Sequence, residues 1–139
     1  MNSFAKIYFV VLSIALLCCN ACSEGKSGIS SLRVSKDFEG KNEAVNFKSG
    51  ETLFASAVLA NAPAKGKVVF TIKNDKGAIL PGTEYKIDVS NTGTTAYKVQ
   101  IAEKATPGKY ILTADMHDGN GEKRDSKNVP ISIDGSAAQ

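Results

Sequence analysis

The chain has 139 residues, and its 17 Lys and Arg against 14 Asp and Glu give a formal net charge of +3. The two signs alternate along the sequence and form no block, which excludes the clustered basic face that nucleic-acid binding needs. All three cysteines lie within the first 22 residues and there is one histidine. We therefore find neither a zinc site of His and Cys ligands nor a catalytic triad, and we expect no cofactor.

The first 22 residues have the layout of a secretory signal peptide. Lys6 precedes an apolar run at residues 7–17, and small residues and cysteines follow that run. The run is too short for a helix that spans a membrane. We therefore expect the chain to be exported, with residues 1–21 as its signal peptide.

The cysteines lie where such a signal ends, and bridges among them would close only trivial loops. The segment resembles the signals of bacterial lipoproteins, in which Leu, one or two small residues and Cys form the lipobox. The resemblance implies lipid on Cys22, which follows Ala21, or on Cys19, which has Leu16 three residues before it. The absence of Asp just after Cys22 resembles outer-membrane sorting. Ordinary signal peptidase would also accept Ala21, so a secreted soluble protein with a free N-terminal thiol is the alternative.

The mature part is expected to hold one domain, because its length is close to the commonest domain size. Residues 22–31 are rich in Ser, Gly and charge and are expected to form a flexible tether. From residue 32 to residue 139 the apolar side chains alternate with polar ones, and turn residues interrupt them every eight to twelve positions, as in β-sandwiches and barrels.

About seven strands follow from this alternation, with Val45 and Phe47 between two loops. The run at 53–59 is apolar or small on both faces, which is typical of a central strand. The runs at 85–89 and 97–101 are joined by a short turn, and we expect them to be antiparallel neighbours. The expected strands lie at 32–34, 53–59, 68–72, 85–89, 97–101, 110–116 and 129–133.

This pattern resembles the immunoglobulin-like and fibronectin type III-like domains, and the expected fold class is an all-β, immunoglobulin-like antiparallel sandwich. The segment Thr106-Pro107-Gly108-Lys109-Tyr110 resembles the turn that leads into a tyrosine corner of such domains. The resemblance implies that Tyr110 is a buried structural residue. The chain has no Trp and no cysteine pair in its body, which disfavours an antibody-type domain.

Two short stretches resemble metal sites and are interpreted as structural. His117 is expected to point away from the apolar face that holds Met116, at a plain strand end. The segment from Asp118 to Glu122 resembles the opening of a calcium loop, but Lys123 stands where that loop needs Gly. A hairpin turn is predicted there. Seven aromatic residues are expected to lie mostly in the core: Phe38, Phe47, Phe54, Phe70, Tyr85, Tyr97 and Tyr110.

The sequence therefore predicts a lipid-anchored envelope protein with a non-catalytic binding or structural module. Its expected partners are the membrane, through covalent lipid, and an envelope protein or surface ligand. One alternative is a periplasmic accessory or carrier subunit that presents a sheet edge or a loop end to a partner. A second is an enzyme whose carboxylates, far apart in sequence, meet in a pocket.

Overall fold

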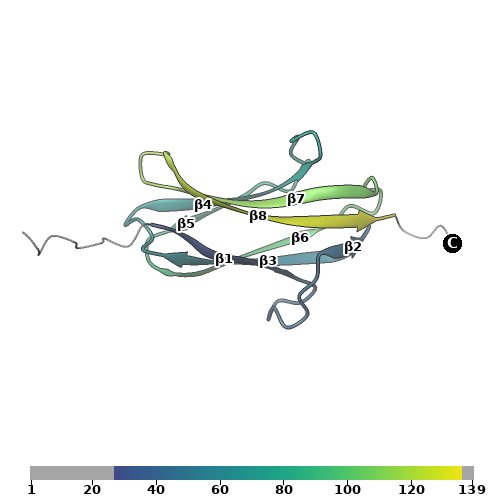
Figure 1. Cartoon of the computed structure of the whole chain (residues 1–139), viewed down its shortest axis with the longest axis horizontal. Coiled ribbons are helices and arrows are strands. Elements are labelled where there is room, and N and C mark those ends of the chain that lie inside the picture. The colour runs from purple at the N-terminus through teal and green to yellow at the C-terminus, as the bar shows by residue number, and fades with distance from the viewer. Residues whose placement is uncertain (1–26, 136–139) are drawn as a thin grey trace, which may run out of the picture.

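The computed structural model describes residues 27–135, which form two β-sheets packed face to face (Figure 1). The three-stranded sheet has the order β1-β3-β6, and the five-stranded sheet has the order β2-β8-β7-β4-β5. All pairs are antiparallel except β2 with β8. The predicted all-β sandwich is confirmed. The strands are β1 (Gly28–Ser35), β2 (Asn46–Lys48), β3 (Thr52–Ala60), β4 (Gly66–Asn74), β5 (Tyr85–Val89), β6 (Gly93–Gln100), β7 (Gly108–His117) and β8 (Lys123–Asp134).

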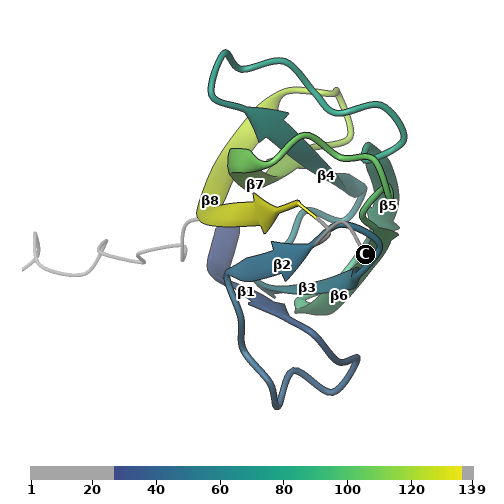
Figure 2. The same ribbon diagram turned by 90° about the vertical axis from the view of Figure 1, so that its right-hand side faces the viewer.

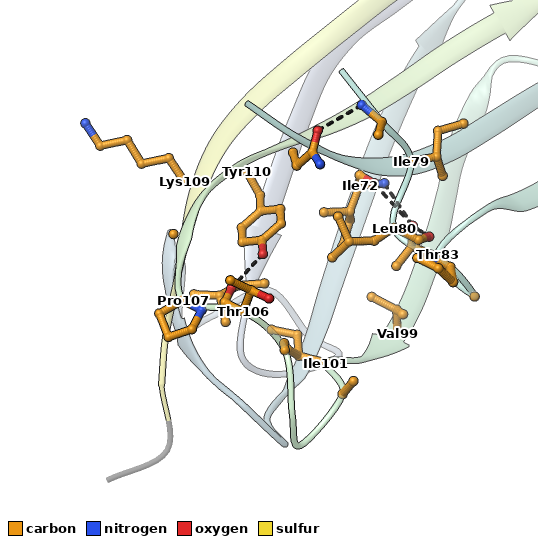
Figure 3. Close-up of a pocket in the computed structure, with 18 of the residues that line it drawn as sticks. Ile72, Ile79, Leu80, Thr83, Val99, Ile101, Thr106, Pro107, Lys109 and Tyr110 are labelled. Carbon is orange, nitrogen blue, oxygen red and sulfur yellow. Dashed lines mark hydrogen bonds between the residues drawn. The ribbon is translucent and has the colours of Figure 1, made fainter. Parts of the chain in front are cut away.

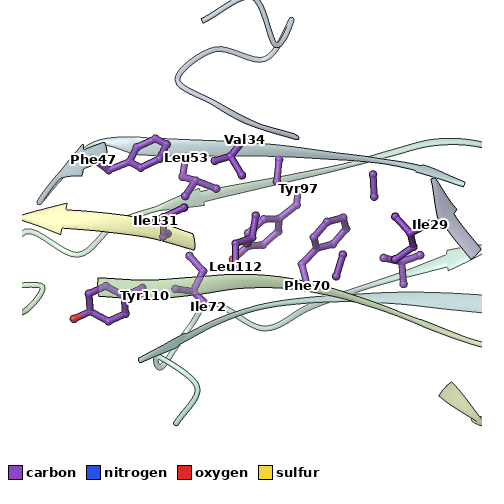
Figure 4. Packing of buried hydrophobic residues seen from close by; sticks show 14 of the residues in the cluster. Ile29, Val34, Phe47, Leu53, Phe70, Ile72, Tyr97, Tyr110, Leu112 and Ile131 are labelled. Carbon is purple, nitrogen blue, oxygen red and sulfur yellow. The ribbon is translucent and has the colours of Figure 1, made fainter. Parts of the chain in front are cut away.

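Alternate side chains of the central strands fill the space between the sheets (Figure 4). Leu53 from β3 points into this space from one sheet, Phe70 from β4 and Leu112 from β7 point into it from the other, and all three are 0% exposed. Burial of one such side chain stabilises the fold by about 1.5–3 kcal/mol relative to leaving it in water. The period-two pattern of the sequence is therefore the pattern of this core.

The first strand begins earlier than the sequence predicts. β1 starts at Gly28, so the last residues of the expected tether at 22–31 belong to the sandwich. Ile29 is 2% exposed, and its N–H donates to the carboxylate of Asp125 at 2.7 Å. A Ser- and Gly-rich stretch lacks the alternation that signals a strand, and its pairing with β3 compensates for that weak local preference.

The expected pairing of β5 with β6 is wrong. β5 pairs with β4 in the five-stranded sheet, whereas β6 pairs with β3 in the other sheet. The connection at residues 90–92 crosses between the sheets, which leaves β5 and β6 as edge strands on the same open side (Figure 2). Alternation predicts which face of a strand is buried, but it carries no information about which strand lies beside it.

Two of the aromatic residues expected in the core lie largely in solvent. Phe38 is 78% exposed and Tyr85 is 53% exposed. Phe38 belongs to the loop at 36–45 and meets Phe54 edge to face, with ring centroids 6.3 Å apart. The alternation of apolar and polar residues ends before Phe38. Outside such an alternating run, the sequence does not show whether an aromatic side chain faces the core or the solvent.

The strands run nearly along the long axis of the molecule, so the sandwich has two ends (Figure 1). Within residues 27–135 no helix is long and apolar enough to cross a membrane. The tether end comprises Gly28 and the turns at 61–65, 90–92 and 118–122. The distal end comprises Gly135 and the connections at 49–51, 75–84 and 101–107.

Candidate functional site: a cleft at the distal end

A cleft of about 1030 Å³ opens at the distal end, between the edges of the two sheets (Figure 3). One wall is the segment at 78–83, which follows β4, and the other is the end of β6 with the connection at 101–107. The start of β7 closes the cleft at its base. The volume lies at the upper end of the range for small-molecule sites. The apolar lining comprises Ile72, Ile79, Leu80, Pro81, Val99, Ile101, Pro107, Tyr110 and Ile133, with three alanines.

The first wall forms because a hydroxyl group is inserted into the edge of the five-stranded sheet. The Leu80 N–H donates to the Ile72 carbonyl at 2.8 Å, as in an ordinary antiparallel pair. The return bond is replaced: the Ile72 N–H donates to Thr83 Oγ1 at 3.2 Å, and that hydroxyl donates to the Leu80 carbonyl at 2.7 Å. Gly82 has a φ of 77°, a left-handed conformation that favours glycine and turns the chain back at this point.

Tyr97 ties this wall to the opposite sheet. Its hydroxyl donates to the Thr83 carbonyl at 2.6 Å, and its ring is stacked on Phe70 with centroids 5.1 Å apart. Burial raises the pKa of the Tyr97 phenol above its usual range, so the hydroxyl remains a donor. The wall at 78–83 is therefore anchored from both sheets.

The base of the cleft contains the predicted tyrosine corner. The Tyr110 ring is 7% exposed, and its hydroxyl donates to the carbonyl of Thr106 at 2.6 Å (Figure 3). The hydroxyl thus returns to the main chain four residues upstream, as the sequence resemblance implies. This contact fixes the connection at 101–107 against the start of β7.

The chemistry of the cleft is that of an apolar surface with a polar rim. The hydroxyls of Thr83 and Tyr110 point to backbone carbonyls and are already used in hydrogen bonds. Asp75 is the one carboxylate among the described residues that line the cleft, and Lys76 and Lys104 supply charge at the rim. The arrangement can bind an apolar group by burial, but it does not bring two carboxylates together.

The residues that the sequence singled out as possible ligands lie at the tether end. The Asp118 carboxylate accepts the N–H groups of Asn120 at 2.9 Å and Glu122 at 3.0 Å, and Arg124 Nε at 2.8 Å. The Arg124 side chain and these backbone donors hold the pKa of Asp118 below its usual range. The predicted hairpin turn is present, and the carboxylate is engaged within it. His117 contacts the Gly121 carbonyl through Nδ1 at 3.1 Å.

Within residues 27–135 no three His, Cys, Asp or Glu side chains gather as metal ligands. The proposed lipid sites, Cys19 and Cys22, lie outside the described residues. Sequence reasoning missed Thr83, and it placed Tyr97 in the core without its hydrogen bond to Thr83, although both residues shape the cleft. The only signal was the Pro81-Gly82 pair, which marks a turn but not the hydroxyl that follows it.

No protein-family model matches the chain, and no curated protein matches it. Among solved structures, the C-terminal domain of wzt superposes with a TM-score of 0.58 at 15% identity, over 82% of this chain and 77% of that one. A putative β-galactosidase from Bacteroides fragilis gives 0.56 at 15% identity, over 76% of this chain and 17% of that one. A chitin-binding domain from Burkholderia pseudomallei gives 0.50 at 12% identity, over 64% of this chain and 56% of that one. At these identities the likeness concerns the fold alone.

Proposed function

We propose that the chain is an exported lipoprotein of the cell envelope whose sandwich is a non-catalytic binding module. Lipid on Cys22, or on Cys19, attaches it to the membrane, with the outer membrane as the expected location. The observation that carries the proposal is the position of the distal cleft, at the opposite end of the sandwich from Gly28, where β1 begins.

Chain length sets the geometry of the anchored protein. Gly28 follows Cys22 by six residues and Cys19 by nine. A chain spans at most about 3.3–3.6 Å per residue, so these segments reach at most about 20 Å and about 30 Å. At about 3.3 Å per residue, the ten-residue β7 and the twelve-residue β8 make the sandwich about 33–40 Å long. With either anchor, the tether end stays within about 30 Å of the bilayer, and the cleft lies at the end of the sandwich farther from the anchor.

The lining of the cleft supports binding rather than catalysis. General acid–base chemistry needs a positioned proton donor and acceptor, usually two titratable side chains near the reacting atoms. Among the described lining residues Asp75 is the single carboxylate, and no histidine contributes. The ligand that fits this surface has an apolar portion that enters the cleft and polar groups that remain at the rim.

The alternative is an accessory subunit that holds a partner protein in the envelope. This alternative is favoured by a specific observation, the free edge of β6 beside the cleft. In both cases the sandwich binds another molecule, and the lipid holds the protein at the membrane. They differ in whether the sandwich binds a ligand at the envelope surface or holds a partner subunit in a complex.

The anchor is tested by the intact mass of the chain extracted from membranes. We expect acyl mass on a chain that begins at Cys22, and loss of membrane attachment in Cys22→Ser. Acyl mass on a chain that begins at Cys19 would move the anchor by three residues. An unmodified chain in the culture supernatant would disprove the anchor.

The cleft is tested with the apolar dye anilinonaphthalene sulfonate, whose fluorescence rises on transfer from water to an apolar site. We expect saturable binding that Ala102→Trp removes, because Ala102 is an exposed residue of the cleft lining. Ala64→Trp is the matched control, since Ala64 is an exposed alanine at the tether end. Equal binding by both variants would place the dye elsewhere and contradict the proposed site.

A further inference from the structure

Three of the four sheet edges are well protected against pairing with another strand, and the fourth is the least protected. β2 has three residues, and β5 has five with Lys86 and Asp88 among them. β1 has an irregular register after Ile29 and is held against β8 through Asp125. Short strands, charges and bulges are the devices by which proteins block their sheet edges.

β6 has one of these devices, a single charge, and neither of the other two. It is eight residues long, pairs with β3 without a register shift, and contains no proline. Lys98 is its one charged residue. β3 is the one strand beside it in the described sheet, so its other edge faces solvent.

The backbone groups on that edge can be assigned from the pairing. The Ile101 N–H donates to the Glu51 carbonyl at 2.9 Å, so the odd-numbered positions of β6 bond β3. In an antiparallel pair the residues between them point their N–H and C=O groups the other way. The free edge therefore offers the main-chain groups of Thr94, Ala96, Lys98 and Gln100.

Apolar side chains lie beside this edge on the open side of the sandwich. Tyr85 of β5 is 53% exposed, with its ring 6.2 Å from that of Tyr97. Ile87 and Val89 are half-buried and pack against the core from the same strand. At the distal end of β6, Val99 and Ile101 line the cleft. A strand added to β6 would cover the side chains of β5 and place one of its own in the cleft.

We infer that the ligand of the distal cleft is an extended polypeptide segment of a partner protein, which adds to the free edge of β6. This inference rests on the proposed binding function of the cleft. Main-chain hydrogen bonds to β6 supply affinity, and alternate apolar side chains facing the interior supply specificity. The cleft between Leu80 and Val99 receives one of these side chains.

A second copy of the chain does not fit this role. The inward side chains of its β6 are committed to its own core: Thr95 is 7% exposed and Tyr97 is 4% exposed, with the Tyr97 hydroxyl bound to Thr83. A second β6 therefore has no side chain free to fill the cleft. Antiparallel pairing of two β6 strands would also direct the two tether ends in opposite directions.

The test uses the purified full chain and a pool of nine-residue peptides that alternate Val, Ile, Leu or Phe with Thr or Lys. We expect binding with slower amide exchange at Thr94, Ala96, Lys98 and Gln100. Ala96→Pro is expected to weaken binding at least tenfold, because proline removes an N–H that points away from β3. Ala96→Ser is the matched control and should bind as the parent does, since it keeps that N–H.

The outcomes separate the inference from the proposed function. Peptides that are N-methylated at alternate residues should not bind, and Ala102→Trp should weaken binding where Ala64→Trp does not. Equal binding of the methylated peptides, equal binding by Ala96→Pro, or no binding at 1 mM peptide would overturn strand addition. A cleft that still binds the dye in those cases would leave the proposed function standing. Self-association that Ala96→Pro abolishes would identify a second copy as the occupant and also overturn the inference.

Discussion

Replacement of Thr83 by valine should destabilise the sandwich by about 2 kcal/mol. Valine keeps the volume of the side chain but removes the hydroxyl that lies between the Ile72 N–H and the Leu80 carbonyl. The Leu80 carbonyl keeps a second donor, the Thr83 N–H at 3.2 Å. The Ile72 N–H loses its one partner, and a buried donor without a partner costs about 1–3 kcal/mol.

Two further variants separate the hydroxyl from the packing. Thr83→Ser keeps the hydroxyl and loses one methyl group, which costs about 1 kcal/mol. Thr71 is a matched control: it is 5% exposed, and no described group bonds its hydroxyl. Thr71→Val should therefore leave the stability unchanged or raise it slightly, because a buried polar group without a partner is removed.

Urea unfolding of the chain from Ser23 measures all three variants. With a slope near 2 kcal/mol per molar urea, a loss of 2 kcal/mol lowers the midpoint by about 1 M. The reasoning fails if Thr83→Val and the parent share a midpoint, or if Thr71→Val is as damaging as Thr83→Val. In the latter case the methyl-for-hydroxyl exchange would be harmful in this core regardless of hydrogen bonding.

Three other results are expected. Tyr110→Phe should lower the free energy of unfolding by about 1 kcal/mol, because the hydrogen bond to the Thr106 carbonyl is lost. Tyr110→Ala should lower it by about 3–5 kcal/mol, because the ring is lost as well. Equal urea midpoints for Tyr110→Ala and the parent would refute a buried tyrosine corner. The pKa of Asp118 is lowered in the folded state, so its ionised carboxylate stabilises the fold at pH values above the unfolded pKa near 4. This contribution is lost as the pH falls through the lower pKa of the folded state. Asp118→Asn should therefore flatten the acidic part of a plot of urea midpoint against pH. Millimolar calcium should leave the melting temperature unchanged, since Asp118 is already engaged with Arg124; a clear rise in calorimetry would contradict this.

The features that the sequence predicted are those encoded over a few neighbouring residues. Period-two alternation predicted the buried faces of β4 and β7. The segment before Tyr110 predicted a tyrosine corner, and the hydrogen bond that closes it joins Tyr110 to Thr106, only four residues upstream. The turn at Asp118 was predicted for the same reason, because its hydrogen bonds join residues within one hairpin. Local chemistry determines such features almost alone.

The features that the sequence missed depend on distant partners. β2 has three residues and exists because it pairs in parallel with the end of β8, more than eighty positions away. The start of β1 depends on Asp125, which lies 96 positions from Ile29. No sequence pattern singles out Thr83, because the N–H that its hydroxyl accepts belongs to Ile72, eleven positions away. A single sequence gives no sign of such partners.

The crossing between β5 and β6 links these structural details to the proposed binding site. If the two strands had been hairpin neighbours, as their sequence spacing suggested, the main-chain groups on one edge of β6 would have been paired with β5. Because they belong to opposite sheets, β6 keeps a free edge, and the Tyr97 hydroxyl bridges the space beside it by its bond to the Thr83 carbonyl. Beyond that contact, toward the distal end, the sheets have no strand between them and the cleft opens. The contact that stabilises the open side therefore also sets the inner limit of the cleft. Tyr97→Phe, which removes the bond and keeps the ring, should both lower stability and alter binding in the cleft, whereas Tyr110→Phe acts on the opposite wall.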